Sequence, residues 1–506
     1  MNSYDLLVVG GGATGSGIAL DAALRGLKVL LLEQNDFAEG TSSRSTKLAH
    51  GGVRYLEAAV KNLDKEQFDL VREGVKERYR LLHNAPHLSK KISLITPLYS
   101  WFEVPYIFAG LALYDLIAGR YSLGRSKIVS KKEIISSNPS VKKEGLKAGV
   151  SYFDGAFNDA RMAIALLQSA KKEGAVVKNY YKVEAFIFDK NHKIVGVKAY
   201  DKISQKEEKF FAKVVINATG VFSDHIRKMA DENVKNIIKP SSGIHIVIDK
   251  KYLPSKNGLM IPKTEDKRVL FILPYMGKCL VGTTDREAEV TEHPKVKESD
   301  IEYLLHHINS YFDLKITKKD ILSSFCGLRP LVDLGLSGSC TSKLAREHII
   351  EELDSGLITI AGGKWTTYRN MAEGLVDLCL KKECFKDMDR RCTTSEYKVV
   401  GSQSDLDSAK ERLDAILKDK ELSERLFLLY GDQALKVLEY EKELNNPHFL
   451  DEKYKILRAE LLYAIDHEFV KKAEDFVYRR VCIGLIDENE SRVLIENTKR
   501  LMDETD

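Results

Sequence analysis

The 506-residue sequence predicts an α/β fold followed by a separate helical domain. An apolar run, a glycine-rich turn, a helical stretch and a second apolar run follow one another before residue 34, which is the order of a βαβ unit. Further strand candidates alternate with helices as far as residue 360, and from about residue 405 the apolar residues recur at helical spacing. At about 150 residues per domain, the length allows roughly three domains.

The elements are expected in the following order. In the first unit we expect a strand at 6–9, a helix at 14–24 and a strand at 29–32. A helix at 160–173 should end before Gly174, because glycine often follows the last residue of a helix. Further strands are expected at residues 175–177, 183–188, 194–199, 214–216, 245–248, 269–273, 280–282 and 357–360. C-terminal helices are expected at 405–417, 423–430 and 460–468, after a linker at 395–404.

Composition excludes several classes of protein. The 78 Lys and Arg residues against 74 Asp and Glu residues give a net charge of +4, which does not indicate a nucleic-acid partner. The seven cysteines show no Cys-x-x-Cys pair or zinc-ligand spacing, so we expect reduced thiols and no metal site. We expect no export signal, and the nearly apolar stretch 106–119 contains Asp115 and is shorter than the ~18–20 residues of a spanning helix.

Gly10, Gly12 and Gly15 match the pattern G-x-G-x-x-G between the first strand and the first helix. In this pattern the first glycine permits the turn, the second lets the backbone approach a pyrophosphate, and the third packs the helix on the strand. Glu33 ends the second strand roughly 20 residues further on, where a carboxylate can accept ribose hydroxyls. The pattern therefore predicts a Rossmann-type dinucleotide site and leaves a nicotinamide or a flavin dinucleotide open.

The later chain favours the flavin. Glu33 leads into "NDFAEGTSSRSTKLAHGGVRYLE", a polar loop whose Ser and Thr donors suit a long, fixed cofactor. The small residues 217–220 end one strand, and "ITIAGGKWTTYR" at 358–369 is a second strand-to-helix glycine turn. Three returns of the chain to one ligand favour FAD. The residues expected to bind it are Gly10, Gly12, Gly15, Glu33, Thr41, Ser42, Lys47, Val177, Ala218, Gly220, Gly363 and Thr366.

The chain resembles the FAD-dependent, quinone-linked glycerol-3-phosphate dehydrogenase family. The resemblance rests on "HGGVRYLE", "YFDGAFNDARM", "INATGVFSD", "EDKRVLFILPY", "VGTTDRE", "GLRPLV" and "GGKWTTYR" in the family's order, and on "LLYAIDHEFVKKAEDFVYRR" near the C-terminus. It implies a glutathione-reductase-like FAD-binding Rossmann domain (1–95, 150–225 and 340–394), a mixed-sheet substrate domain (96–149 and 226–339) and an all-α C-terminal domain (395–506).

The resemblance also implies a reaction. The family oxidises sn-glycerol 3-phosphate to dihydroxyacetone phosphate by hydride transfer to FAD and passes the electrons to a membrane quinone. The related glycerol-3-phosphate oxidase, which reduces O2 to H2O2, shares these motifs and stays open as the alternative. A flavin-bearing binding protein without turnover is a third reading, against which the retained cations argue.

A dianionic phosphate needs permanent cations, which Arg and Lys supply. The resemblance assigns Arg54, Tyr55 and Arg346 to the substrate phosphate, and it assigns Arg329 and Lys364 to the reacting carbon and the flavin.

The hydroxyl proton of the substrate needs a base, and an arginine is a poor one because it stays protonated. His245 and His50 are the better candidates, and we prefer His245. Thr283 and Thr284 in "GTTDRE" are either further donors near the substrate or an ordinary strand-ending turn.

A quinone acceptor implies contact with a bilayer. Aromatic and apolar residues crowd residues 101–116, with Lys90 and Lys91 before them and Arg120, Arg125 and Lys127 after them. This mixture is typical of a helix lying on an anionic membrane surface, although a buried core helix is the other interpretation. The resemblance implies a cytoplasmic protein held peripherally on the inner face of the cytoplasmic membrane, and a homodimer is a further expectation.

Overall fold

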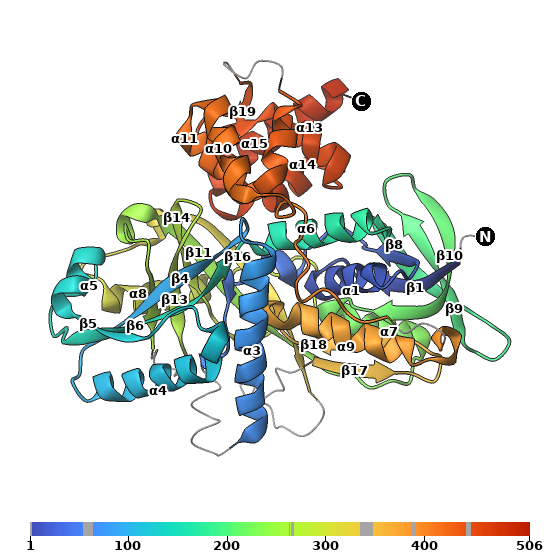
Figure 1. Ribbon diagram of the computed structural model, residues 1–506, viewed down its shortest axis with the longest axis horizontal. Coiled ribbons are helices and arrows are strands. Elements are labelled where there is room, and N and C mark those ends of the chain that lie inside the picture. The colour runs from blue at the N-terminus through green and yellow to red at the C-terminus, as the bar shows by residue number, and fades with distance from the viewer. Residues whose placement is uncertain are drawn as a thin grey trace.

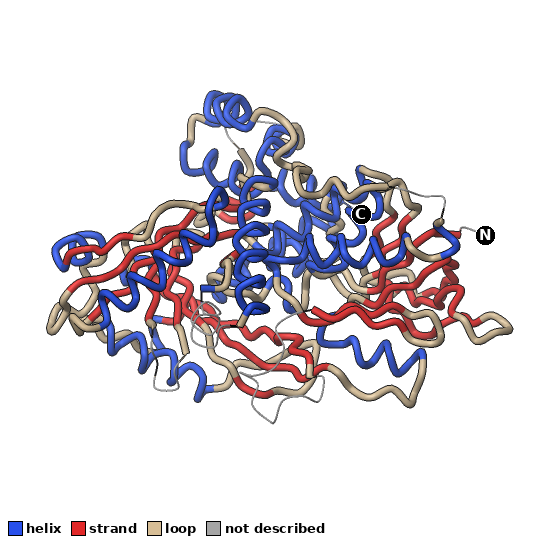
Figure 2. Tube along the Cα trace, turned by 60° about the horizontal axis from the view of Figure 1, so that its bottom comes forward, coloured by secondary structure: helices blue, strands red, loops and turns tan. Residues whose placement is uncertain are grey.

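The computed structural model describes residues 3–53, 64–262, 264, 268–333, 348–386, 390–441 and 447–505. Two β-sheets lie side by side, and the C-terminal helices lie over the junction between them (Figure 1). A second view shows the strands in two groups, with helices above and between them (Figure 2). This architecture confirms the predicted fold class, an FAD-type α/β fold followed by a helical C-terminal domain.

The first sheet has the strand order β17-β18-β10-β1-β2-β7, and the hairpin β8-β9 joins it at β10. Strands β10, β1, β2 and β7 run parallel, as the predicted βαβ unit requires. Their bounds are β1 (Ser3–Val9), β2 (Val29–Leu32), β7 (Val176–Lys178), β8 (Tyr181–Phe188), β9 (Ile194–Asp201), β10 (Lys206–Asn217), β17 (His348–Glu352) and β18 (Ile358–Gly362).

Helix α1 (Ala13–Leu24) packs between α6 (Asp159–Lys172) and α9 (Tyr368–Leu380) on one face of this sheet. Asn158 caps α6 by accepting a hydrogen bond from the Arg161 N–H, and Gly174 follows its end with a φ of 97°. Helix α7 (Ser223–Ala230) adds Ile226 to the core on the other side. The local signals were therefore sufficient for α1 and α6, whereas α7 was not predicted.

The second sheet is mixed, with β12 parallel to β4 and the other pairs antiparallel. Its order is β15-β11-β14-β13-β12-β4-β6-β3, and β16 pairs with β11 while β5 pairs with β6. The bounds are β3 (Leu48–Ala49), β4 (Ser89–Leu98), β5 (Lys127–Ser130), β6 (Ala148–Phe157), β11 (Ile238–Asp249), β12 (Gly258–Ile261), β13 (Leu270–Tyr275), β14 (Lys278–Gly282), β15 (Arg286–Glu287) and β16 (Ile321–Val332). Helices α3 (Lys65–Asn84), α4 (Glu103–Ala118), α5 (Lys131–Ser137) and α8 (Glu298–Tyr311) accompany it.

Two predicted domain boundaries are wrong. Strands β4 and β6 pair with each other along their whole length inside the second sheet, so the divisions at 95/96 and 149/150 cut through strands of the substrate domain. Residues 89–95 and 150–157, which were predicted to belong to the FAD-binding domain, therefore belong with the second sheet.

The C-terminal domain contains α10 (Leu406–Leu417), α11 (Lys420–Tyr430), α12 (Ala434–Leu438), α13 (Arg458–His467), α14 (Ala473–Asp475) and α15 (Glu488–Thr505). The expectation of an all-α domain needs a correction, because β19 (Phe449–Asp451) and β20 (Ile456–Leu457) form a small antiparallel sheet. These strands are too short to give a periodic signal.

Candidate active site

A cavity of about 840 Å³ is lined by residues of both sheets. The first sheet contributes the turn after β1, the loop after β2 and the residues that follow β10 and β18, and the second contributes residues of β11 and β16 and those that follow β14. Ligand sites usually occupy about 300–1,000 Å³, so the volume suits a large ligand.

The glycine turn between β1 and α1 lies at one end of this cavity. Gly10 has a φ of 110°, and a Cβ there would lie 2.6 Å from the carbonyl oxygen of Ala218. A Cβ on Gly15 would lie 1.9 Å from the carbonyl oxygen of Gly10, so α1 crosses the turn at a distance that only glycine allows. Gly12, immediately before α1, lines the cavity. The turn therefore exposes backbone at the N-terminus of α1, the arrangement that receives a pyrophosphate.

Glu33 lies beside this turn. Its carboxylate accepts hydrogen bonds from the N–H groups of Gly11 (2.7 Å) and Asn35 (3.0 Å) and lines the cavity. Burial raises the pKa of Glu33 although both hydrogen bonds lower it. Each carboxylate oxygen can accept more than one hydrogen bond, so Glu33 retains capacity for ribose hydroxyls.

Thr41 and Ser42 line the cavity, but Lys47 does not. The Ser42 hydroxyl accepts a hydrogen bond from the Ala13 N–H (2.9 Å), and the Thr41 hydroxyl donates to the Leu328 carbonyl (2.6 Å).

The prediction of Lys47 as a cofactor ligand is wrong for its side chain. Its buried ammonium group donates to the Ser43 carbonyl (2.5 Å) and forms an ion pair with Asp159 (2.5 Å) inside the protein. The conformation of the loop, which sequence spacing does not report, turns this side chain inward.

Ala218, Gly220, Gly363 and Thr366, which were predicted to bind FAD, all line the cavity. Val177 is a correction, since it lies in β7 beside Leu31 of β2 and is not part of the cavity wall. Residues 181–183, at the start of the following strand β8, line the cavity instead.

His245 lines the cavity from β11 and is only 2% exposed. Its ring stacks on Phe325 with centroids 5.0 Å apart, and its Nε2 lies 3.0 Å from the Thr46 hydroxyl. Burial, followed by the charges of Lys47 and Arg329, lowers the pKa of His245 well below its ordinary value. The imidazole is therefore neutral at pH 7, the form that can accept a proton.

Arg329 on β16 faces the same cavity. Its guanidinium donates to the Thr284 carbonyl (2.8 Å) and the Thr283 hydroxyl (3.3 Å), and it forms an ion pair with Asp285 (3.3 Å). Both threonines thus hold Arg329 in place, and Thr284 also accepts the Ile244 N–H (3.1 Å). In these contacts both threonines accept hydrogen bonds, so they hold Arg329 and do not act as donors there.

Lys364 and His50 also line the cavity, so four predicted catalytic side chains surround one space. Arg54, Tyr55 and Arg346 lie outside the described residues. Sequence reasoning missed further members of the cavity wall, namely Arg44, Thr46, Arg268, Asp285 and Trp365. Of these, Arg44 lies in "TSSRSTK" and Arg268 in "EDKRVL". Both could have been identified by considering every charged residue of the quoted segments.

Comparison with known proteins defines the class of protein to which the chain belongs. Residues 5–369 match the family described as FAD dependent oxidoreductase, and residues 392–505 match the C-terminal domain of alpha-glycerophosphate oxidase. The chain is 41% identical over 503 residues to the mitochondrial glycerol-3-phosphate dehydrogenase SDP6 of Arabidopsis thaliana, covering 96% of this chain and 80% of that protein. It is 39% identical over 504 residues to the mitochondrial glycerol-3-phosphate dehydrogenase of Rattus norvegicus, covering 96% and 68%.

Among solved structures, the glycerol-3-phosphate dehydrogenase from Bacillus halodurans complexed with FAD aligns with a TM-score of 0.80 at 32% identity, covering 100% of this chain and 91% of that chain. The chain therefore belongs to the glycerol-3-phosphate dehydrogenase family of FAD dependent oxidoreductases, as its motifs predicted.

The residues present fit FAD. The glycine turn and Ser42 form a cradle at the start of α1 in which a Cβ on Gly12 would lie 2.9 Å from the Ser42 hydroxyl oxygen. Glu33 offers acceptors beside it, and Gly363 and Thr366 line the same cavity. The pyrophosphate would be held at the turn and the adenosine ribose at Glu33.

Proposed function

We propose that this protein oxidises sn-glycerol 3-phosphate to dihydroxyacetone phosphate with bound FAD as the hydride acceptor. The observation that carries the proposal is the meeting of a dinucleotide turn, a buried neutral histidine and the side chains of Arg329 and Lys364 around one cavity. The relatives named above as glycerol-3-phosphate dehydrogenases supply the substrate. Bound FAD supplies the hydride acceptor, which is chemistry that proteins take from a cofactor.

The cations of the cavity position the substrate. Arg329 is held by Thr283 and Thr284, so its guanidinium is oriented before substrate arrives. Lys364 adds a second positive charge on the cavity wall. Positive groups fixed in this way stabilise the negative charge that develops on the substrate oxygen as its proton leaves.

His245 accepts the proton of the substrate hydroxyl through Thr46. The imidazole is almost fully buried, whereas the Thr46 hydroxyl lies 3.0 Å from its Nε2 and lines the cavity. A hydroxyl both donates and accepts, so it can pass a proton to the ring. Thr46→Val, which removes the hydroxyl at similar volume, should lower turnover nearly as far as His245→Gln. Normal turnover in Thr46→Val would refute the relay through Thr46, and normal turnover in His245→Gln would leave His50, which is more exposed in the cavity, as the base.

The acceptor of the electrons is proposed to be a membrane quinone, reached from the exposed face of α4. Phe102, immediately before α4, is 91% exposed, and Leu116 and Tyr106 on the helix are 76% and 55% exposed, whereas Leu111 and Tyr114 on the other face are buried. Helix α4 thus has apolar residues on both faces, one packed in the core and one toward solvent. The first face fits a core helix and the second fits a helix on a membrane surface. Helix α4 lies on the side of the molecule opposite the C-terminal helices (Figure 1).

The charge around α4 supports an anionic surface as its partner. Lys90, Lys91, Arg120, Arg125 and Lys127 are all exposed. Within the described residues, no helix is both long and apolar enough to cross a membrane. We therefore propose peripheral attachment to the inner face of the cytoplasmic membrane, with the apolar face of α4 in the headgroup region.

Steady-state assays test the proposal. Purified protein should reduce a soluble quinone analogue with sn-glycerol 3-phosphate, and glycerol or sn-glycerol 1-phosphate should give little or no reduction. Stoichiometric H2O2 in aerated buffer together with slow quinone reduction would instead establish the oxidase. Reduction of the quinone by glycerol at an equal rate would refute the role of the phosphate.

A further inference from the structure

The loop that follows β2 has two faces. Glu33, Asn35 and residues 38–42 line the cavity, whereas Asp36 and Phe37 are fully buried and contact the C-terminal domain. The same short loop therefore holds cofactor-facing residues and anchors to another domain.

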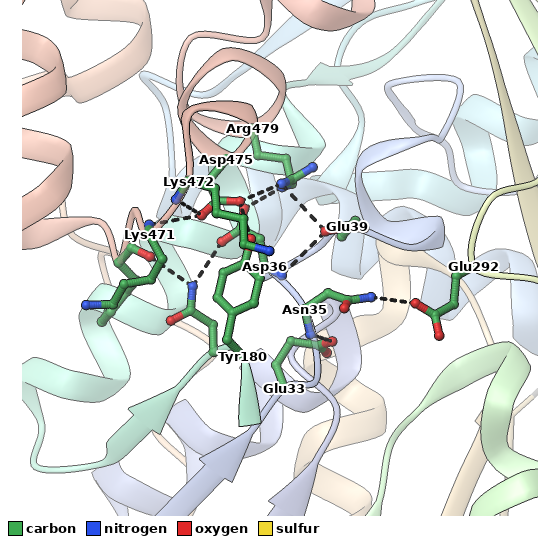
Figure 3. A network of polar contacts seen from close by, with 12 residues as sticks. Glu33, Asn35, Asp36, Glu39, Tyr180, Glu292, Lys471, Lys472, Asp475 and Arg479 are labelled. Carbon is green, nitrogen blue, oxygen red and sulfur yellow. Dashed lines mark hydrogen bonds and ion pairs between the residues drawn. The ribbon is translucent and has the colours of Figure 1, made fainter. Parts of the chain in front are cut away.

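Asp36 is the centre of a buried ionic cluster (Figure 3). Arg480 binds both of its carboxylate oxygens (2.7 and 2.8 Å), and Arg479 donates to one of them. Burial would raise the pKa of Asp36, but the charges of Arg480 and Arg479 lower it to about 2. A bidentate guanidinium–carboxylate contact fixes position as well as charge.

Asp475 continues the cluster on the C-terminal side. It accepts hydrogen bonds from Arg479 (3.0 Å) and from the hydroxyl of Tyr180 (2.7 Å), and it also accepts the backbone N–H groups of Lys471 and Lys472. The C-terminal segment that bears the two arginines is thereby fixed to the residues that follow β7 (Figure 3).

An aromatic contact leads to the glycine turn itself. Phe469 of the C-terminal domain meets Phe37 edge to face with centroids 5.2 Å apart. Phe37 lies under the turn so closely that a Cβ on Gly11 would be 2.5 Å from its ring. The Gly11 carbonyl also accepts the Ala38 N–H (3.1 Å), which joins the loop and the turn.

We propose that Arg479 and Arg480 are positioning residues for FAD, through which the C-terminal domain sets the affinity of the cofactor site. Their contact with Asp36 holds the loop whose other face presents Glu33 and Ser42 to the cavity. A buried ion pair that loses one partner leaves an uncompensated charge, which is costly, so the loop leaves its place when the cluster is broken. Affinity falls because the site then has to be reordered on binding. The inference rests on the proposed function only in taking FAD as the cofactor.

The chain offers a matched control for this cluster. Glu468 and Arg161 form a second buried ion pair between the C-terminal domain and α6, with two contacts of 2.6 Å, and it does not include the loop after β2. Asp36→Asn breaks the first cluster and Glu468→Gln breaks the second, each by an isosteric change. Both variants weaken the attachment of the same domain.

The experiment measures FAD affinity on the purified full-length holoprotein, by FAD fluorescence during stepwise release and rebinding. Asp36→Asn should raise the Kd for FAD about tenfold or more, or about 1.4 kcal/mol, while Glu468→Gln stays within about twofold at a comparable loss of Tm. Amide hydrogen exchange should rise in residues 34–42 only in Asp36→Asn. Saturating FAD should restore the visible flavin spectrum of this variant.

A Kd for FAD that stays at the value of the parent protein in both variants would overturn the inference. An equal rise of the Kd in both variants would also overturn it. If Asp36→Asn does not fold, Arg479→Gln, which leaves the bidentate Arg480 contact, gives the same comparison with a smaller expected shift. None of these readouts uses glycerol 3-phosphate. Failure of the proposed reaction would therefore leave this test intact, and failure of this test would leave the reaction intact.

Discussion

Replacement of Gly15 by alanine tests the geometry of the dinucleotide turn. The added Cβ would lie 1.9 Å from the Gly10 carbonyl oxygen, and contacts of a Cβ below 3.0 Å do not persist, so α1 must move by about 1 Å relative to the turn. Overpacking of this kind costs about 1–3 kcal/mol. The free turn can relax, whereas FAD requires the close approach, so most of this cost falls on binding. At 1.4 kcal/mol per tenfold, the Kd for FAD should rise about 5- to 150-fold.

Gly374→Ala in α9 is the matched control, because its Cβ meets no described atom within 4 Å. Alanine in a helix interior is favoured over glycine by about 1 kcal/mol, so this variant should keep FAD and unfold at an equal or higher temperature. Bound flavin per protein and Kd are measured for both variants, with circular dichroism to establish folding. A folded Gly15→Ala that binds FAD as tightly as the parent protein would refute the assignment of the turn.

Three further predictions concern the reaction and the membrane. His245→Gln should lower kcat by about 10²- to 10⁴-fold with FAD content unchanged. In the unsubstituted protein the pKa of His245 is lowered and the neutral imidazole accepts the proton, so kcat/KM should fall with decreasing pH only well below pH 6.5. A loss of kcat/KM that begins at or above pH 6.5 would contradict this assignment. Arg329→Lys should lower kcat/KM by about 10²-fold with FAD retained, since a lysine cannot reproduce the planar contacts to Thr283 and Thr284; an unchanged kcat/KM would remove Arg329 from the site. Phe102→Asp with Leu116→Asp should abolish flotation with anionic liposomes, while Val493→Asp, 52% exposed on α15, should not, and equal flotation of all variants would exclude α4 as the contact.

The structure decides which residues of the apolar segment are suitable for the membrane test. Leu111 is central to the apolar segment in the sequence, but it is 4% exposed and packs in the core with Tyr114. A charge at Leu111 would therefore unfold the substrate domain and report on stability alone. Spacing identified the segment, whereas the division of its residues between core and surface depends on strands far away in the chain.

The first βαβ unit was predictable because its signals are local. Strand, turn and helix each follow from a few adjacent residues, and the roles of Gly10 and Gly15 follow from where those elements begin. The sheet to which β4 and β6 belong was not predictable in this way, since their pairing is set by contacts between distant segments.

The same distinction applies to the site. His245 and Arg329 were identified from motif segments and line one cavity. Lys47 was assigned to the cofactor because its neighbours in the sequence are, yet its partner Asp159 lies on α6 and draws it inward. Asp36 gave no signal at all, because its meaning depends on Arg479 and Arg480, more than four hundred residues away.

Anaerobic addition of sn-glycerol 3-phosphate to the purified holoprotein tests the central claim most directly. The account predicts that the oxidised flavin absorbance bleaches within the mixing time of a manual experiment, that glycerol leaves it unchanged, and that a quinone analogue restores it. Dithionite serves as the control that the bound flavin can be reduced. If dithionite reduces the flavin but sn-glycerol 3-phosphate leaves it oxidised, the account is contradicted.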